Sequence, residues 1–308
     1  MMWQKKGLIF NVKGNYPWNK THAQVPVVDI LEDRLRIYYS TRNDSGQSLI
    51  SFIDVTLDDP SKIIYEHDLP ILDFGKPGTF DDCGLMPTSI ITLNNKKYLY
   101  YIGWTAKKTV PFHNSIGVAI SLDNGLTFTK FSEGPIITTN HLEPYFSGTA
   151  YVMNEGGRFK MWYLSCVKWL EYKNSLEPIY HIKYAESDDG LNWMQTGKVC
   201  VDLKNDEGGI ASPSVIKDGI YKMWYSYRKA VDYRTNPLNS YKIGYAESYD
   251  GINWERKDSL AGIDTSAVGW DSGMIAYPYI ISLNGKKLLF YNGNGFGKTG
   301  FGYAEESI

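Results

Sequence analysis

Acidic side chains that could act in acid and base catalysis recur along this chain, each shortly before an apolar segment. They are Asp82, Glu143, Glu207 and Asp271. Two carboxylates on either side of a sugar can act as general acid and base on a glycosidic bond. We therefore predict that these four residues are catalytic. The alternative is that each caps a turn or pairs with a nearby cation, which would be a structural role.

Cationic and aromatic side chains accompany the carboxylates and are candidates for substrate contacts. Arginine can hold a carboxylate or a phosphate with two hydrogen bonds, and a Trp ring offers an apolar face with a polar edge. The predicted substrate-binding residues are His22, Arg42, Asp81, Trp104, Lys168, Arg228, Trp270 and Asn292. An acidic group on the substrate, or phosphate as a co-substrate, would explain the cations. Pairing with Asp82 or Glu207 would explain them too.

An internal repeat supplies the elements that must position these residues. A proline column reads Pro26, Pro87, Ala150, Pro213 and Pro278, at intervals of 61, 63, 63 and 65 residues. A second column, an aromatic pair, reads Tyr38-Tyr39, Tyr100-Tyr101, Trp162-Tyr163, Trp224-Tyr225 and Phe290-Tyr291. Repeats of this length built from strands are typical of propeller blades arranged around one axis.

One repeat reads as four strands. In the fourth repeat, apolar or alternating runs cover 210–217, 220–227 and 241–248, and a weaker run begins at Trp254. Asp-Gly turns separate them, which suit backbone positions with φ > 0 and indicate a structural role. The sequence therefore predicts an all-β fold, a five-bladed β-propeller with four antiparallel strands per blade.

The fifth repeat stops after its third strand. Residues 3–10 share a Trp and a Gly four residues later with the fourth strand of the third repeat, at 193–199. We predict that residues 3–10 complete the last blade and close the ring, which removes exposed strand edges. The prediction is one domain, 1–308, with blades at approximately 19–75, 80–135, 143–203, 207–260, and 270–308 plus 1–10.

Three long segments are predicted as loops on one face of the ring. They connect the second and third strands of their repeats at 103–114, 165–180 and 226–241. Long loops in a compact fold are often functional, so the predicted site is a pocket at the axis on this face.

Composition narrows the classes of partner. The net charge is −2, so we expect no nucleic-acid partner. The three cysteines, Cys83, Cys166 and Cys200, lack a metal-binding spacing, and no apolar run matches a signal peptide or a membrane span. We expect a cytoplasmic protein with no membrane partner and with no metal or cofactor. The oligomeric state is not encoded in these patterns.

The repeat units resemble those of the five-bladed propeller glycosidases. The matching segments are YKMWYS (221–226), IGYAESYDGINW (243–254) and GWDSGMIAYPYII (269–281). They are similar to repeats of the superfamily that holds glycoside hydrolase families 43, 32 and 130, and the resemblance covers all five repeats. It implies a carbohydrate-active enzyme that cleaves or transfers a glycosidic bond of an oligosaccharide or glycoconjugate. Because some members hold a calcium ion near the axis, the resemblance also makes an axial calcium ion the alternative to a protein without a metal.

The sequence departs from that family at one column. In families 43 and 32, the resemblance implies acids on the innermost strands, immediately next to the proline column. Here that column reads Val25, Met86, Thr149, Ser212 and Tyr277. An enzyme would have to take its acids from slightly earlier positions, which are the four carboxylates named first. The alternative function is a non-catalytic propeller that binds glycan.

Overall fold

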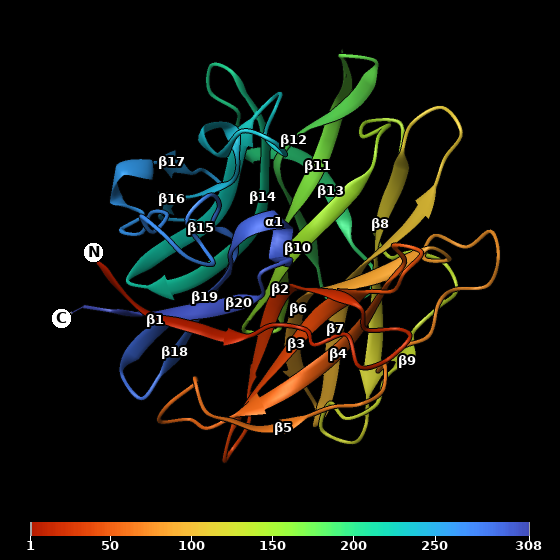
Figure 1. Cartoon of the computed structure of the whole chain (residues 1–308). Helices are drawn as coiled ribbons and strands as arrows, with labels where there is room; N and C mark the ends of the chain where they lie inside the picture. Colours follow the sequence, from red (N-terminus) through yellow and green to blue (C-terminus); the bar gives the residue numbers. More distant parts are fainter. Residues whose placement is uncertain (1, 308) are drawn as a thin grey trace.

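The structure is a computed structural model, and it describes residues 2–307. Strands dominate it, which confirms the all-β prediction (Figure 1). The helical segments of this part of the protein are short: α1 (Asn294–Gly297) and 3-10 turns at Pro237–Asn239 and Asp258–Leu260. None of the helices in residues 2–307 has the length and apolar character needed to cross a membrane.

Antiparallel pairing groups the described strands into five sets of four, which we call units 1 to 5. Unit 1 holds β2 (Thr21–Ile30), β3 (Leu35–Arg42), β4 (Ser48–Val55) and β5 (Ile63–Glu66). Unit 2 holds β6 (Gly84–Leu93), β7 (Lys96–Ala106), β8 (Phe112–Ser121) and β9 (Thr129–Lys130). Unit 3 holds β10 (Ser147–Glu155), β11 (Arg158–Tyr172), β12 (Ser175–Ser187) and β13 (Met194–Val201).

The last two units follow the same order. Unit 4 holds β14 (Glu207–Asp218), β15 (Ile220–Lys229), β16 (Lys242–Ser248) and β17 (Glu255–Arg256). Unit 5 holds β18 (Ala276–Leu283), β19 (Lys286–Asn292), β20 (Phe301–Glu306) and β1 (Trp3–Phe10). Short turns join first and second strands, and in unit 5 Asn284 and Gly285 both have φ > 0, as tight hairpins favour.

The first strand of each unit lies innermost. These strands contact one another in the cycle β2, β6, β10, β14, β18 and back to β2. They are buried along most of their length, as expected for strands covered on both faces. The centre of the cycle is therefore where residues of all five units can meet.

Strand β1 (Trp3–Phe10) completes the last unit, as the sequence predicts. Strand β1 pairs antiparallel with β20, from Trp3 opposite Glu306 to Phe10 opposite Phe301. Trp3 also reaches unit 4, because its indole Nε1 donates to Ala261 O at 3.0 Å and its ring meets Trp224 edge to face at 5.7 Å. The N-terminal strand thus joins the two units at the end of the repeat array.

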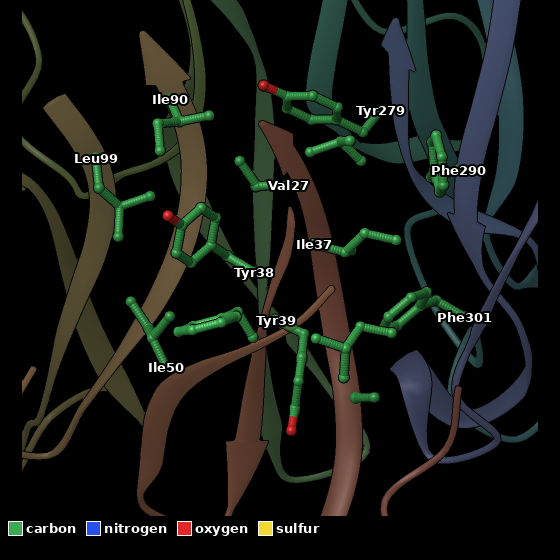
Figure 2. Packing of buried hydrophobic residues seen from close by; sticks show 14 of the residues in the cluster. Val27, Ile37, Tyr38, Tyr39, Ile50, Ile90, Leu99, Tyr279, Phe290 and Phe301 are labelled. Atoms are coloured by element: carbon green, nitrogen blue, oxygen red, sulfur yellow. The ribbon is translucent and has the colours of Figure 1, made fainter. Parts of the chain in front are cut away.

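The first member of each aromatic pair in units 1 to 3 donates to the next unit. Tyr38 Oη donates to Gly125 O at 2.8 Å, Tyr100 Oη to Gly190 O at 2.9 Å, and Trp162 Nε1 to Gly251 O at 2.7 Å. Figure 2 shows Tyr38 and Tyr39 inside an apolar cluster to which units 1, 2 and 5 contribute, among them Ile90 of unit 2 and Phe290 of unit 5. Each acceptor belongs to an Asp-Gly or Asn-Gly turn, so these turns are structural.

The prediction of a loop at 165–180 is wrong. This segment is an extended hairpin in which β11 and β12 stay paired from Phe159 opposite Ser187 to Tyr172 opposite Ser175. Its inner residues Leu164 and Cys166 are buried in an apolar cluster with Phe146 and Tyr180. This packing favours strand over loop, although the polar residues of the segment suggest a loop in the sequence.

The docking of β1 can be tested by truncating one buried ring. Trp3→Ala removes the indole contacts with Ala261 and Trp224, so we expect a loss of about 3–5 kcal/mol in the free energy of unfolding. Leu8→Ala in the same strand is the control, since Leu8 is 42% exposed and we expect a change of about 0.5 kcal/mol. Chemical denaturation followed by tryptophan fluorescence and circular dichroism measures both, and equal effects would contradict the assigned docking.

Candidate functional site

A cavity of about 490 Å³ lies where the first strands converge. Eight aromatic residues line it, namely Trp104, Phe112, Phe146, Tyr180, Tyr233, Tyr241, Tyr277 and Phe296. Arg42, Arg234, Gln24, Asn114 and Thr149 supply its polar groups. No Asp or Glu of residues 2–307 lines it. The volume falls within the range of roughly 300–1,000 Å³ found for small-molecule sites.

The residues before the proline column still face this cavity. Val25, Met86, Thr149 and Tyr277 all line it. Bulges interrupt the innermost strands here, and Val25, Ser212 and Tyr277 have φ of 52°, 51° and 55°. Left-handed backbone is uncommon for such residues and is found where surrounding structure enforces it, often at functional sites. Four of the five residues at this position therefore line the cavity, and none of the five is an acid.

Side-chain and backbone hydrogen bonds hold these bulges. The Ser212 N–H donates to Thr149 Oγ1 at 2.7 Å, and the Tyr277 N–H donates to Ser226 Oγ at 2.7 Å. The Val25 N–H donates to Asn292 Oδ1 at 2.7 Å, and the Asn292 amide donates in turn to Ala23 O and Gly300 O. Asn292, predicted to bind substrate, is fully buried and makes these contacts instead of lining the cavity.

Three of the acidic residues predicted for the site do not line the cavity. Each accepts a hydrogen bond from the tyrosine that is the second member of its own unit's aromatic pair. Tyr101 Oη donates to Asp81 at 3.1 Å, Tyr163 Oη to Glu143 at 2.8 Å, and Tyr291 Oη to Asp271 at 3.0 Å. In all three pairs the carboxylate precedes the tyrosine by 20 residues. That spacing is visible in the sequence and could have revealed the pairs.

Cations complete the environment of these carboxylates. Lys130 of β9 lies 2.6 Å from Asp81, and Lys5 of β1 lies 2.7 Å from Asp271. Glu143 accepts from Ser165 Oγ at 2.7 Å, with Lys183 Nζ at 3.7 Å. All three carboxylates are at most 3% exposed. Each of these carboxylates therefore connects the inner part of its unit to the outer part. This is the structural role that was the alternative to catalysis.

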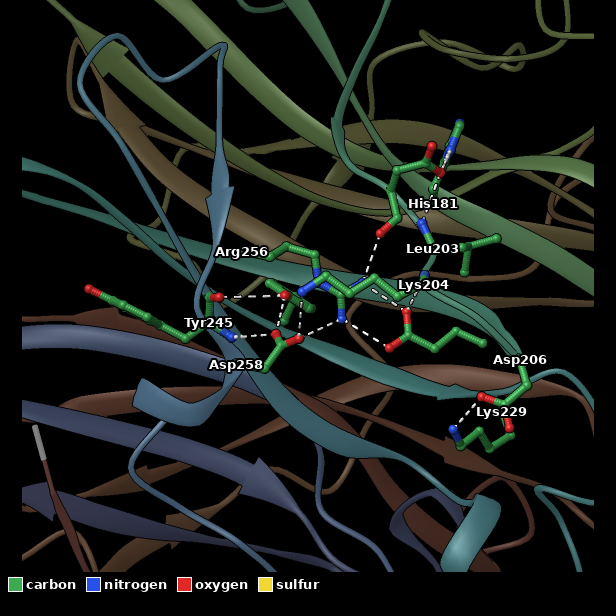
Figure 3. Close-up of polar contacts among 11 residues, drawn as sticks. His181, Leu203, Lys204, Asp206, Lys229, Tyr245, Arg256 and Asp258 are labelled. Atoms are coloured by element: carbon green, nitrogen blue, oxygen red, sulfur yellow. Dashed lines mark hydrogen bonds and ion pairs between the residues drawn. The ribbon is translucent and has the colours of Figure 1, made fainter.

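The other two predicted catalytic residues also have protein partners. Glu207 forms a two-point pair with Arg256 at 2.8 and 3.0 Å, and Arg256 also donates to Asp258 at 2.7 Å (Figure 3). Asp82 accepts from the Gly78 N–H at 2.9 Å. Burial raises the pKa of Asp82, but hydrogen bonds from Gly78, Thr105 and Cys83 outweigh it and lower the pKa. A lowered pKa suits a carboxylate held as an anion more than a general acid.

The predicted substrate-binding residues divide into two groups. Arg42 and Trp104 line the cavity, and Trp104 Nε1 donates to Ser48 Oγ at 2.8 Å. The others do not line it. Lys168 is exposed on β11, Trp270 stacks on Tyr291, and His22 lies on β2 beside Thr21.

Arg228 lies directly behind the tyrosines of the wall. Its guanidinium lies 3.7 Å from the centre of the Tyr233 ring and donates to Tyr180 Oη at 3.1 Å and Pro178 O at 2.7 Å. The hydroxyl of Tyr180 bonds that of Tyr241. Arg228 therefore fixes three rings that face the cavity and acts as a positioning residue.

Sequence reasoning predicted Trp104 of the aromatic wall but missed Tyr180, Tyr233 and Tyr241, and it missed one acid beside them, Glu177. Glu177 does not line the cavity, but it accepts from Tyr233 Oη at 2.6 Å and from the Arg234 guanidinium, and both of these residues do. Burial raises the pKa of Glu177, but the hydrogen bonds from Arg234 and Tyr233 outweigh burial, so the pKa is lowered overall. These residues lie outside the repeated columns, in the hairpin and the 226–241 connection, so the repeat pattern gave no signal for them.

Metal ligands do not gather in the described residues. Within 2–307, no group of three or more His, Cys, Asp or Glu side chains is placed to hold an ion. A calcium ion at the axis stays a prediction from the resemblance.

Relatives of this protein match it from end to end. The uncharacterized proteins MT1551 and Rv1502 of Mycobacterium tuberculosis (strains CDC 1551 / Oshkosh and ATCC 25618 / H37Rv) are each 37% identical over 307 residues. The match covers 99% of this chain and 99% of each relative. The protein belongs to the family of these two relatives. No protein-family model matches it.

Solved structures show which fold this family has. The BT0996 RGII complex has a TM-score of 0.75 at 18% identity, covering 99% of this protein and 92% of that one. A GH130 structure, from a family of mannoside phosphorylases that contains glycoside hydrolases, has a TM-score of 0.70 at 15% identity. The match covers 99% of this protein and 93% of that one. The Bombyx mori GH32 β-fructofuranosidase BmSUC1 has a TM-score of 0.65 at 15% identity, and the match covers 96% of this protein and 62% of that one. The fold is that of the glycoside hydrolase-like propeller proteins, as the repeats suggested.

Replacement of one buried acid separates a structural role from a catalytic one. Asp271→Asn breaks the pair with Lys5 and leaves a cation in a mostly buried place, so we expect a loss of about 3–5 kcal/mol in the free energy of unfolding. Asp206→Asn is the control, because its pair with Lys229 is exposed and we expect no measurable change. Thermal and urea unfolding measure both, and an Asp271→Asn variant of unchanged stability would contradict the structural assignment.

Proposed function

We propose that the five units are the blades of one closed propeller and that its central cavity binds a saccharide. The contacts between neighbouring first strands and the pairing of β1 with β20 support the closed ring. The propeller glycosidase fold of the structural neighbours supports a carbohydrate ligand. The observation that carries the proposal is the lining of the cavity, which is aromatic with polar groups between the rings.

The lining suits a sugar for a physical reason. One face of a pyranose ring presents C–H groups and packs on Trp or Tyr, while its edge of hydroxyl groups needs directed hydrogen bonds. Trp104 and Tyr241 offer rings, and Asn114 and Thr149 offer amide and hydroxyl groups in the same cavity. Such a site satisfies both surfaces of the ligand at once.

The same lining favours binding over bond cleavage. Cleavage of a glycosidic bond generally requires a pair of carboxylates flanking it. The cavity wall carries none among residues 2–307, and Asp82, Glu143, Glu207 and Asp271 are each engaged by protein groups. We therefore place glycan binding first and glycosidic cleavage or transfer second.

One observation keeps cleavage as the second candidate. Glu177 contacts two residues of the cavity wall, Tyr233 and Arg234. A shift of this side chain towards a bound sugar would supply one carboxylate, which is ionised at neutral pH and suited to a base. The second acid would have to come from the four carboxylates predicted from the sequence.

Removal of one wall ring tests the binding proposal. We expect Trp104→Ala to weaken saccharide binding at least about 10-fold, since stacking and burial of one aromatic face are lost. Tyr249→Ala is the control, because Tyr249 is 91% exposed and does not line the cavity. A glycan array followed by calorimetry on the best ligand gives the affinities. Equal affinities for wild type and Trp104→Ala would place the ligand elsewhere, and Trp104→Phe checks that the fold is retained.

An activity screen separates the two candidates. Purified protein is incubated with aryl glycosides and oligosaccharides, with and without phosphate, and products are measured by chromatography. We expect no turnover of saccharides that bind. Turnover that disappears in Glu177→Gln or Asp82→Asn, with binding retained, would overturn the order of the candidates and identify an enzyme.

A further inference from the structure

Arg42 differs from the other arginine of the cavity wall in having no acidic partner. It lies at the end of β3, and its Nε donates to Gln24 Oε1 at 3.0 Å. Within residues 2–307, no carboxylate lies in salt-bridge range of Arg42, and its Nη1 and Nη2 have no hydrogen-bond partner. Neither nitrogen is a buried unpartnered atom, so both remain reachable. Arg234, by contrast, is paired with Glu177.

Gln24 fixes the direction of this guanidinium. It is 2% exposed, and its amide is used at both ends, accepting from Arg42 Nε and donating to the Phe296 carbonyl. Phe296 follows Gly295 in the α1 segment, where both residues have φ near 60°. In Figure 1 this segment lies beside β2, near the centre of the molecule. Because Nε is held, the edge formed by Nη1 and Nη2 is left for a ligand.

The positive charges of Arg42 and Lys298 both act on a neighbouring residue, His22. Burial, then the charges of Arg42 and Lys298, lower the pKa of His22 to about 4. Lys298 directly follows the α1 segment, and no carboxylate pairs with it in the described part of the protein. The junction between units 1 and 5 is therefore a place of uncompensated positive charge. A guanidinium that is partly removed from water without a counter-ion is costly, and an anionic ligand would offset that cost.

Strained backbone supports a built site at this junction. His22 and Val25 have φ of 66° and 52°, and β2 has two register shifts against β3 between Thr21 and Val27. Bulges of this kind re-aim side chains and concentrate beside binding sites. The Asn292 amide holds the bulge through the Val25 N–H.

We propose that the ligand of the cavity carries an anionic group, a sugar carboxylate or a phosphate, which Arg42 binds through Nη1 and Nη2. A planar guanidinium can hold two oxygens of either group at once, which a lysine cannot do. Lys298 adds positive potential, His22 stays neutral at neutral pH because its pKa is lowered, and Gln24 is the positioning residue. This inference rests on the proposed saccharide site for its sugar part, but the anion contact can be measured by itself.

The test compares matched neutral and acidic ligands by calorimetry. One pair compares oligosaccharides of glucose, which are neutral, with oligosaccharides of glucuronic acid. The other pair compares oligosaccharides of galactose with oligosaccharides of galacturonic acid. A sugar phosphate and inorganic phosphate form separate arms. We expect an acidic or phosphorylated member to bind at least about 10-fold more tightly than its neutral counterpart, and Arg42→Gln to remove that difference. Arg42→Lys should restore only part of it.

The control for charge is Arg34→Gln, because Arg34 lies on the β2–β3 turn beside Asp33 and does not line the cavity. Thermal unfolding of each variant checks that it folds, and Lys298→Gln provides a second variant at the exposed end of the site. Equal binding of neutral and acidic saccharides by the wild type would overturn the anionic subsite and leave the saccharide site standing. Absence of any saccharide binding would overturn the proposed function instead. Inorganic phosphate binding that is lost in Arg42→Gln would support the subsite with free phosphate as the anion.

Discussion

The hydrogen bond from the aromatic pair of one unit to the turn of the next is the contact on which this structure depends. Neighbouring four-stranded units share few backbone pairings, such as the single parallel bridges between β4 and β6 and between β12 and β14, so buried side chains have to fix their relative angle. Tyr38, Tyr100 and Trp162 do so because each ring packs between units while its polar edge reaches a glycine carbonyl. A Cβ on Gly125 would lie 2.2 Å from Tyr38 Oη, so close approach requires glycine there.

The second aromatic of each pair has a different partner. Tyr101, Tyr163 and Tyr291 bind a carboxylate of their own unit, and Tyr225 binds Asp258 in unit 4. Unit 1 departs from this pattern, since Asn19 stands at the corresponding place and the Tyr39 hydroxyl is buried without a partner. The carboxylates thus stabilise the inside of the units. Because they face the tyrosines, they are directed away from the cavity.

The cavity consequently takes its chemistry from other elements. The bulged innermost strands present Val25, Met86, Thr149 and Tyr277, and the connections between second and third strands supply Tyr233 and Arg234. Rings with few charges make a wall suited to a sugar, and Arg42 adds one cation without a counter-ion. Recognition of a ligand, more than acid and base catalysis, is what this set of side chains offers.

The sequence by itself determined the repeat, the all-β class and the pairing of residues 3–10 with the last unit. These three features follow from local patterns, namely the proline column, the aromatic pair and the turns. The patterns recur because every unit packs against its neighbours in the same way. The 20-residue spacing of acid and tyrosine was also present in the sequence. Arg42 and Trp104 could be predicted as wall residues because they end the second strands.

Only the tertiary structure decided which side chains meet at the centre. Asp81 precedes the first strand β6 and Arg42 ends the second strand β3, and the sequence does not show which of these two charged residues meets the cavity. Lys130, nearly 50 residues away in the sequence, neutralises the first, and nothing within residues 2–307 neutralises the second. The aromatic wall was hidden for the same reason, since Tyr180, Tyr233 and Tyr241 come together only when Arg228 packs behind them. Charge compensation and ring packing are contacts between distant segments, and no local pattern records them.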